Sequence, residues 1–235
     1  MGKTILFGPS GFFGPMILKK YSDIIAVGRT PPPSYCKNRF IKIKSISNLK
    51  VLDKLDIEKV IFLIGNSNHH YLNKRNIDVA LNYNFFPLKI ALDYFSKRKK
   101  KITKFITFSG ALIYDEKKLK LPCKENADLD PYKNNYIFSK YLVEQLARTY
   151  SSLLPIINIR LSNIYGPSHL KRPDLINNLF SQSFKKNKKI LVNNILPKRD
   201  FIFGPDVAEA IIKLLKTDYR GMINIGSGQL TSVKD

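Results

Sequence analysis

A tyrosine and a lysine four residues apart are the best candidates for catalysis in this 235-residue chain. Tyr136 and Lys140 belong to the segment Tyr-Ile-Phe-Ser-Lys, and residues at positions i and i+4 share one face of a helix. An ammonium beside a phenol lowers the pKa of the phenol, which makes the tyrosine a usable acid or base near neutral pH. Such pairs also occur on solvated helix faces, so the pair predicts proton transfer only when other parts of a site accompany it.

A glycine-rich turn supplies such a part. Three glycines spaced as GxxGxxG follow the predicted strand Thr4–Phe7 and open a helix predicted to begin near Pro15. The first glycine permits a tight turn, the second lets the backbone approach a pyrophosphate, and the third lets the helix pack close to the strand. The predicted dinucleotide-binding residues here are Gly8, Ser10, Gly11, Phe12, Phe13 and Gly14.

The end of the second predicted strand bears on the choice of cofactor. An acidic residue at this position would accept a hydrogen bond from the adenosine ribose and would disfavour a 2′-phosphate. The strand instead ends Val27-Gly28-Arg29-Thr30, without a carboxylate. An arginine suits a phosphate group, so Arg29 favours NADP, with NAD as the alternative. Stacking of Arg29 on the adenine is the other interpretation of this residue.

The elements that must position these residues alternate along the chain. Short β-branched runs alternate with helical stretches, which indicates an α/β fold with a doubly wound parallel Rossmann sheet. Residues 1–160 are expected to form the NAD(P)-binding domain, and residues 161–235 a mixed segment that completes the sheet and contributes to the substrate site. The predicted strands are Thr4–Phe7, Ile24–Val27, Phe40–Ile43, Val60–Ile64, Lys104–Phe108 and Ile156–Arg160, and the main predicted helices are Asn76–Ser96 and Tyr136–Leu153.

Taken in order, the motifs give the chain a resemblance to the extended short-chain dehydrogenases, the family of nucleotide-sugar epimerases, dehydratases and reductases. The resemblance covers nearly the whole chain and is specific for the family but not for one substrate. Family members continue beyond the last motif, which indicates a small or truncated C-terminal substrate-binding portion. The matching segments are Gly8–Gly14, Phe105–Ser109 leading to Tyr114, Tyr136 with Lys140, Asn158–Pro167, Arg199–Phe201 with Asp206–Ala208, and Asn224–Gly228.

The resemblance implies roles for several residues. Tyr136 would exchange a proton with a sugar hydroxyl or ketone, and Lys140 would hold the nicotinamide ribose and lower the pKa of Tyr136. Asn82 matches an asparagine of the preceding helix, and Asn163 matches a residue near the sugar and diphosphate of the substrate. Both are therefore expected to bind substrate.

One of the departures from the family pattern concerns the catalytic hydroxyl. The catalytic serine or threonine of the family precedes the tyrosine matching Tyr114 by four residues, and this position is Gly110 here. Ser109, one residue earlier, is the candidate that could supply the missing hydroxyl. We therefore include Ser109 among the predicted catalytic residues.

The same segment narrows the reaction. The dehydratases of the family carry an Asp-Glu pair where this chain has Ala111 and Leu112, and the fucose-type epimerase-reductases need a cysteine at Leu112. Simple hydride transfer remains, and Arg29 favours reduction of a 4-keto nucleotide-activated sugar by NADPH. The alternatives are a nucleotide-sugar 4-epimerase that retains NAD and a non-catalytic NADP-binding regulatory protein.

Composition sets the remaining expectations. The net charge of +22 could indicate a nucleic-acid partner, but the lysines are scattered, so we expect no nucleic acid. The two cysteines are expected to be reduced thiols of a cytoplasmic protein. The three histidines lack metal-ligand spacing, so no metal site is expected. No apolar run reaches the length of a membrane span, so membrane insertion is not expected.

The helix Asn76–Ser96 bears on assembly. In the family this helix and the one holding Tyr136 pack against their copies in a dimer, so a homodimer is expected. An apolar stripe of this helix could form that contact, or it could face the sheet. The stripe consists of Leu81, Phe85, Leu88 and Leu92.

Overall fold

A computed structural model describes the chain except for residues 1, 119, 171–174, 185–189, 193 and 235. Its centre is a seven-stranded parallel sheet in the order β3-β2-β1-β4-β5-β6-β9. The chain adds strands on one side of β1 up to β3 and then continues on the other side with β4. This strand order is that of a doubly wound fold, so the predicted fold class is confirmed. The strands are β1 (Lys3–Phe7), β2 (Ile25–Gly28), β3 (Phe40–Lys42), β4 (Ile57–Phe62), β5 (Lys104–Gly110), β6 (Ile156–Leu161) and β9 (Gly221–Ile225).

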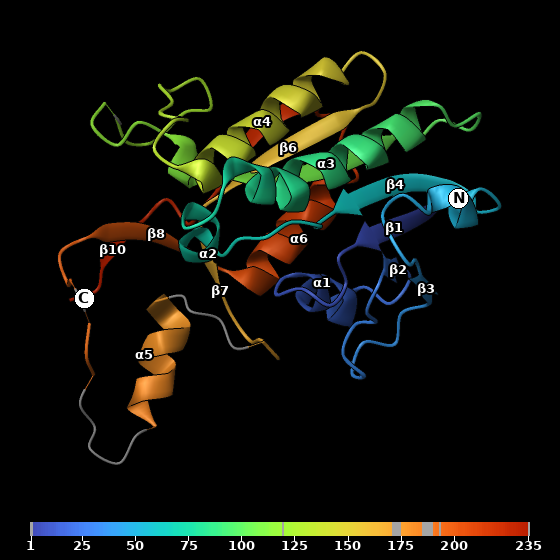
Figure 1. The fold of residues 1–235 in the computed structure, drawn as a ribbon. Helices are drawn as coiled ribbons and strands as arrows, with labels where there is room; N and C mark the ends of the chain where they lie inside the picture. The colour runs from blue at the N-terminus through green and yellow to red at the C-terminus, as the bar shows by residue number, and fades with distance from the viewer. Residues whose placement is uncertain (1, 119, 171–174, 185–189, 193, 235) are drawn as a thin grey trace.

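Helices cover both faces of this sheet (Figure 1). One face packs against α3 (Ile77–Ser96) and α4 (Asn135–Thr149), and the other against α1 (Gly14–Lys20) and α6 (Gly204–Leu214). Alternate residues of β5 show the division, because Phe105 belongs to the core under α3 and α4 and Ile106 to the core under α1 and α6. A strand buried on both faces is mostly apolar, which explains the apolar residues Phe105, Ile106 and Phe108 of β5.

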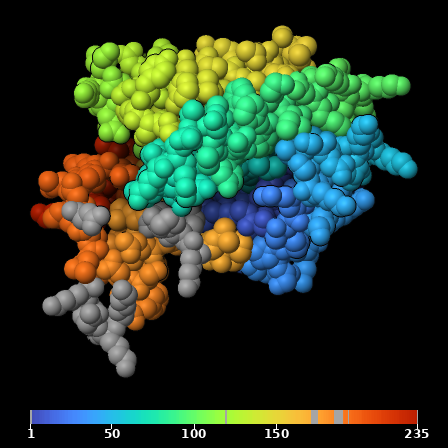
Figure 2. Space-filling model, in the orientation of Figure 1, coloured from blue at the N-terminus to red at the C-terminus, as the bar shows by residue number. Residues whose placement is uncertain are grey.

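The C-terminal portion divides between two sheets. Strand β9 extends the main sheet beside β6, whereas β7 (Asn163–Tyr165), β8 (Lys198–Phe203) and β10 (Leu230–Ser232) form a small sheet with β8 in the middle. Helix α5 (Leu175–Ser183) lies in the same portion. Figure 2 shows this portion (orange) next to the teal segment that holds α2 (His69–Asn73). The expected boundary at residue 160 falls inside β6, so the two predicted parts share that strand.

One predicted helix is shorter than expected. Helix α4 ends at Thr149 and not at Leu153, because the N–H groups of Ser151 and Leu153 bond to carbonyls three residues back, as in a turn. The start of α4 is fixed by Asn134, whose side chain accepts a hydrogen bond from the N–H of Ile137 at 3.0 Å. This cap sets the position of Tyr136 in the first turn.

Candidate active site

The ends of the parallel strands bring the predicted site residues to one edge of the sheet. The glycine turn follows β1, Gly65 follows β4, Gly110 ends β5 and Asn163 follows β6. Ligands of doubly wound folds bind at this edge, beside the point where the strand order reverses. The fold therefore places the candidate cofactor turn and the candidate catalytic helix at a common edge.

The glycine turn has the compactness that a dinucleotide site needs. Gly8 has φ +81°, a conformation that other residues rarely adopt. A Cβ at Gly14 would come within 2.7 Å of the Gly8 carbonyl oxygen, so only glycine allows the helix to start there. A Cβ at Gly11 would meet only that same oxygen, at 3.4 Å, so the space around this position is largely open. The turn fits a pyrophosphate.

The remaining residues of the turn have different surroundings. The ring of Phe13 is buried and packs edge-on against Phe108, with ring centroids 6.3 Å apart. Phe12 packs against the same core, and Ser10 is half-buried. Phe12 and Phe13 can thus contribute backbone N–H groups to a phosphate, while their side chains stabilise the turn.

Tyr136 and Lys140 lie together on α4, as predicted. The Lys140 ammonium nitrogen is 6.0 Å from the centroid of the Tyr136 ring, and Tyr136 is buried. Burial lowers the pKa of Lys140 to about 8. A lysine held this close to its titration range can exchange its charge state near neutral pH, which suits a residue that tunes a neighbouring phenol.

An asparagine of α3 approaches this pair, but it is not the predicted one. Asn82 is exposed, whereas Asn84 is buried and donates to the Ser139 hydroxyl at 2.9 Å. That hydroxyl donates in turn to the Tyr136 carbonyl at 2.7 Å. A Cβ on Gly65 would lie 3.0 Å from the Asn84 amide oxygen and 3.6 Å from the Lys140 nitrogen. Asn84 therefore lies at the site where the sequence predicts Asn82.

The periodicity of α3 contains the signal that points to Asn84. Leu88 and Leu92 follow Asn84 at intervals of four residues, and all three are buried toward the sheet. Asn82 lies on the other side of the helix. The same burial shows that the Leu88 and Leu92 part of the apolar stripe faces the sheet and not a partner subunit.

Ser109 has a partner other than a substrate. Its buried hydroxyl donates to Glu144 of α4 at 2.5 Å. Glu144 also forms a buried ion pair with Arg160 of β6, with nitrogen and oxygen 2.7 Å apart. These contacts connect β5, α4 and β6 through Ser109, Glu144 and Arg160. The network stabilises the fold, and this is the role the structure indicates for the Ser109 hydroxyl.

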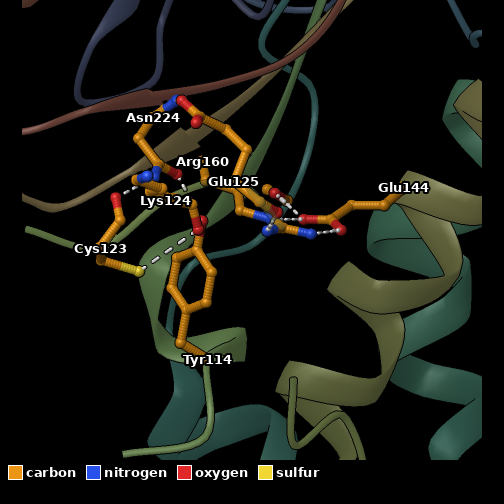
Figure 3. Close-up of polar contacts among 8 residues, drawn as sticks. Tyr114, Cys123, Lys124, Glu125, Glu144, Arg160 and Asn224 are labelled. Atoms are coloured by element: carbon orange, nitrogen blue, oxygen red, sulfur yellow. Dashed lines mark hydrogen bonds and ion pairs between the residues drawn. The ribbon is translucent and has the colours of Figure 1, made fainter. Parts of the chain in front are cut away.

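The ion pair continues into a larger polar cluster, shown in Figure 3. The guanidinium of Arg160 lies 4.8 Å from the centroid of the buried Tyr114 ring, and the Tyr114 hydroxyl donates to the Asn224 side chain at 2.6 Å. Asn224 donates from its backbone to the Glu125 carboxylate at 2.9 Å and from its side chain to the Cys123 carbonyl at 3.0 Å. This cluster fixes the segment that leads into α4, and it gives Tyr114 and Asn224 structural roles that their motifs alone do not predict.

Asn163 lies at the junction of the two sheets. Its side chain donates to the Asp200 carbonyl of β8 at 3.3 Å and is half-buried. The Asp200 carboxylate accepts from Ser162 at 3.1 Å and from the backbone of Ser227 and Gly228 at 2.8 and 2.9 Å. Asn163 is therefore held at the edge where β7 and β8 leave the main sheet, and its role toward a substrate remains a prediction.

Arg29 is exposed immediately after β2. Gly28 before it packs against the glycine turn, since a Cβ there would lie 2.8 Å from Pro9. This contact places Arg29 beside the predicted cofactor turn with its side chain open to solvent.

Three further expectations concern metal binding, membrane insertion and the cysteines. In the described part of the chain no three histidine, cysteine, aspartate or glutamate residues gather as a metal site would need. No helix among the described residues is long and apolar enough to cross a membrane. Cys36 and Cys123 are not bonded to each other.

The chain is similar to several known proteins. The model of the NAD dependent epimerase/dehydratase family matches residues 5–226. An uncharacterized 37.6 kDa protein from Escherichia coli O111:H- is 34% identical over 120 residues, which are 50% of this chain and 35% of that protein. The chain thus matches about a third of that relative's length.

Solved structures share the fold over nearly the whole chain. A UDP-N-acetylglucosamine 4-epimerase from Methanobrevibacter ruminantium M1 is 21% identical with a TM-score of 0.83, over 99% of this chain and 79% of that one. An NAD dependent NDP-hexosamine 5,6-dehydratase of tunicamycin biosynthesis is 20% identical with a TM-score of 0.86, over 100% of this chain and 78% of that one. A UDP-glucose 4-epimerase from Thermotoga maritima is 20% identical with a TM-score of 0.82, over 99% and 79%.

Proposed function

The chain belongs to the NAD dependent epimerase/dehydratase family, and from this premise we propose that it is an NAD(P)-dependent oxidoreductase acting on a nucleotide-activated sugar. The observation that carries the proposal is Tyr136 with Lys140 on α4, at the same sheet edge as the glycine turn. A redox-sensing regulator that only binds a dinucleotide needs no such pair, so the pair favours an enzyme.

Each group of the site has a part in this chemistry. The nicotinamide supplies or accepts a hydride when bound. Tyr136 gives a proton to the substrate oxygen during reduction and takes one during oxidation. Lys140 holds the ribose of the dinucleotide and, while charged, favours the ionised form of Tyr136. Asn84 and Ser139 orient the first turn of α4 through the Tyr136 carbonyl.

Arg29 supports net reduction of a 4-keto sugar with NADPH as the reductant. No carboxylate follows β2 at residues 28–30, and Arg29 is free to meet a 2′-phosphate from the solvent side. An exchangeable NADPH drives net reduction, since each turnover consumes one reductant. The segment Ala111–Leu112 has no acid to expel a hydroxyl, so dehydration is not proposed.

A 4-epimerase that retains NAD is the second candidate. The similarity of fold to the named 4-epimerases favours it, and the same Tyr136 would serve both the oxidation and the re-reduction. Asn163 and the edge of β8 are proposed to contact the sugar and diphosphate in either case.

The identity of the bound cofactor and the product separate these candidates. The purified protein is denatured and any released dinucleotide is identified by mass. It is then incubated with UDP-glucose, UDP-galactose, UDP-N-acetylglucosamine and a 4-keto nucleotide sugar, with NADPH or NADH. Oxidation of NADPH by the keto sugar supports the reductase, and interconversion of two sugars without added cofactor supports the epimerase. If no sugar is converted, the proposed enzyme function is wrong.

A further inference from the structure

The candidate site lacks one hydrogen-bond donor for the substrate oxygen. Gly110 carries no side chain at the end of β5, and the Ser109 hydroxyl donates its hydrogen bond to Glu144. Tyr136 alone would then stabilise the charge that develops on the oxygen during hydride transfer. Loss of one such donor typically slows an enzyme by roughly 100- to 1,000-fold. A side chain close to Tyr136 could supply this second donor.

His69 is the group that faces Tyr136 from another element. It is the first residue of α2, and its ring centroid lies 6.2 Å from that of Tyr136. The neighbouring His70 ring lies 4.2 Å from His69 but is exposed. His69 itself is half-buried.

A series of asparagines fixes α2 against the catalytic helix. The Asn84 side chain accepts from the Asn66 backbone at 2.8 Å, and the Asn66 side chain accepts from the Asn68 backbone at 2.8 Å. Asn68 caps the N-terminus of α2. At the other end of α2, the Asn73 side chain accepts from the Tyr136 backbone N–H at 3.0 Å. Helix α2 is thus attached on both sides to the residues that orient Tyr136.

The surroundings of His69 favour its neutral form. Burial, the adjacent His70 and the positive charge of Arg199 on β8 all lower the pKa of His69. A neutral imidazole has one N–H donor and one acceptor nitrogen, so it can hydrogen-bond to an oxygen without adding a full charge. The titratable and charged groups near His69 on other elements are Tyr136 of α4 and Arg199 of β8.

We infer that His69 is a second catalytic residue, which donates a hydrogen bond to the substrate oxygen in place of the hydroxyl that Gly110 lacks. As Tyr136 transfers its proton to this oxygen, the N–H of His69 binds the same oxygen and keeps its own proton. In the reverse direction the oxygen returns its proton to Tyr136, and His69 stabilises the forming carbonyl. The inference rests on the proposed function, because it assigns a partner to the same reacting oxygen.

The test compares variants at three positions. His69→Leu removes the donor and keeps an apolar side chain, and His69→Gln keeps an N–H donor. His70→Leu is the matched control, since it changes the adjacent exposed ring. A fourth variant combines His69→Leu with Gly110→Ser, because a Cβ at Gly110 would lie 3.7 Å from its nearest neighbour, the Leu161 carbonyl, and so fits without strain.

The kinetic readout separates chemistry from folding. We expect His69→Leu to lower kcat by roughly 10- to 1,000-fold, with unchanged dinucleotide affinity and a cooperative thermal transition. His69→Gln should retain a larger share of kcat, His70→Leu should match the wild type, and Gly110→Ser should restore part of the rate to His69→Leu. If His69→Leu keeps a wild-type kcat while Tyr136→Phe is inactive, the inference is wrong and the proposed function stands.

A binding readout tests the same contact without turnover. The chain has three histidines, so their ring carbon–proton NMR signals can be assigned with the His69→Gln and His70→Leu variants. The Tyr136→Phe protein is then titrated with the nucleotide sugar that the wild type converts. This sugar should shift the His69 signal more than the His70 signal. An unshifted His69 signal at saturating sugar would contradict the inference. Conversion of no sugar by the wild type would overturn the proposed function and the inference together.

Discussion

The ammonium of Lys140 lies 6.0 Å from the ring centroid of Tyr136, one helical turn further along α4. Burial lowers the pKa of this lysine to about 8, so the free protein bears a cost for keeping it charged at neutral pH. Groups poised in this way are frequent at functional sites, where stability is given up for chemistry.

Replacement of this lysine should therefore stabilise the free protein. In the unfolded chain the lysine keeps a pKa near 10.4. Between pH 8 and that value the unfolded state binds more protons than the folded state, so the contribution of Lys140 to stability rises with pH across this window. Below pH 8 the burial cost is fully present. Lys140→Met should raise the melting temperature at pH 7 and lose activity.

Thermal unfolding at pH 7 and pH 10 measures this effect. The difference between Lys140→Met and the wild type should be larger at pH 7 and shrink at pH 10. Lys54→Met serves as the control, because that lysine is exposed and lies outside α4. A Lys140→Met protein that is less stable than the wild type at pH 7 would contradict the burial of an unfavourable charge.

Ser109 should contribute to stability more than to rate. Its hydroxyl donates to the buried Glu144, and loss of a hydrogen bond to a charged group typically costs about 1.5–3 kcal/mol. Ser109→Ala should lower the free energy of unfolding by about that amount and leave kcat within a few-fold of the wild type. Ser151→Ala, which alters an exposed hydroxyl beyond α4, is the control. A large loss of kcat without loss of stability would restore Ser109 as a catalytic residue.

Arg29 should discriminate between the two dinucleotides. If it binds the 2′-phosphate, Arg29→Ala should weaken NADPH by roughly 1–3 kcal/mol, the typical value of a charge-assisted hydrogen bond, and leave NADH almost unchanged. Titration calorimetry of both dinucleotides measures the difference. Arg39→Ala alters an exposed arginine just before β3 and should change neither affinity. Equal losses for both dinucleotides would indicate stacking on the adenine.

Helix α3 should take part in a homodimer through its outward face. Tyr83 and Phe86 are 42% and 44% exposed on this face, while Leu88 and Leu92 are buried toward the sheet. We expect a dimer by light scattering at tens of micromolar protein, on the order of weak-dimer affinities. Phe86→Lys should yield a monomer that keeps its melting temperature, and Tyr35→Lys, an exposed ring elsewhere, should not. A monomeric wild type would contradict the prediction.

The parts of the fold that repeat a simple pattern could be predicted from the sequence. Strands buried on both faces are rich in β-branched and other apolar residues, and the six predicted strands all correspond to strands of the main sheet. Strand β9 is not among the predicted strands, because its segment Gly-Met-Ile-Asn-Ile is short and is interrupted by the polar Asn224. Its pairing with β6 depends on contacts distant in sequence, which periodicity does not show.

The site was predictable where one residue type has one chemical use. The glycine turn and the pair on α4 belong to this class. The role of Ser109 could not be predicted in this way. Its hydroxyl could serve a substrate or a buried carboxylate, and the choice depends on Glu144 from another element. The sequence predicts no role for His69, because nothing in the local sequence shows that α2 folds back against Tyr136.

The exchange Tyr136→Phe tests the central claim most directly. It removes one hydroxyl from a buried ring and keeps the packing of that ring. Single-turnover hydride transfer is followed by the absorbance of reduced nicotinamide, with the nucleotide sugar that the wild type converts, and dinucleotide binding is measured on the same samples. The account predicts a rate that is about 100- to 10,000-fold slower with unchanged dinucleotide affinity. A Tyr136→Phe protein that transfers hydride at the wild-type rate would contradict the account.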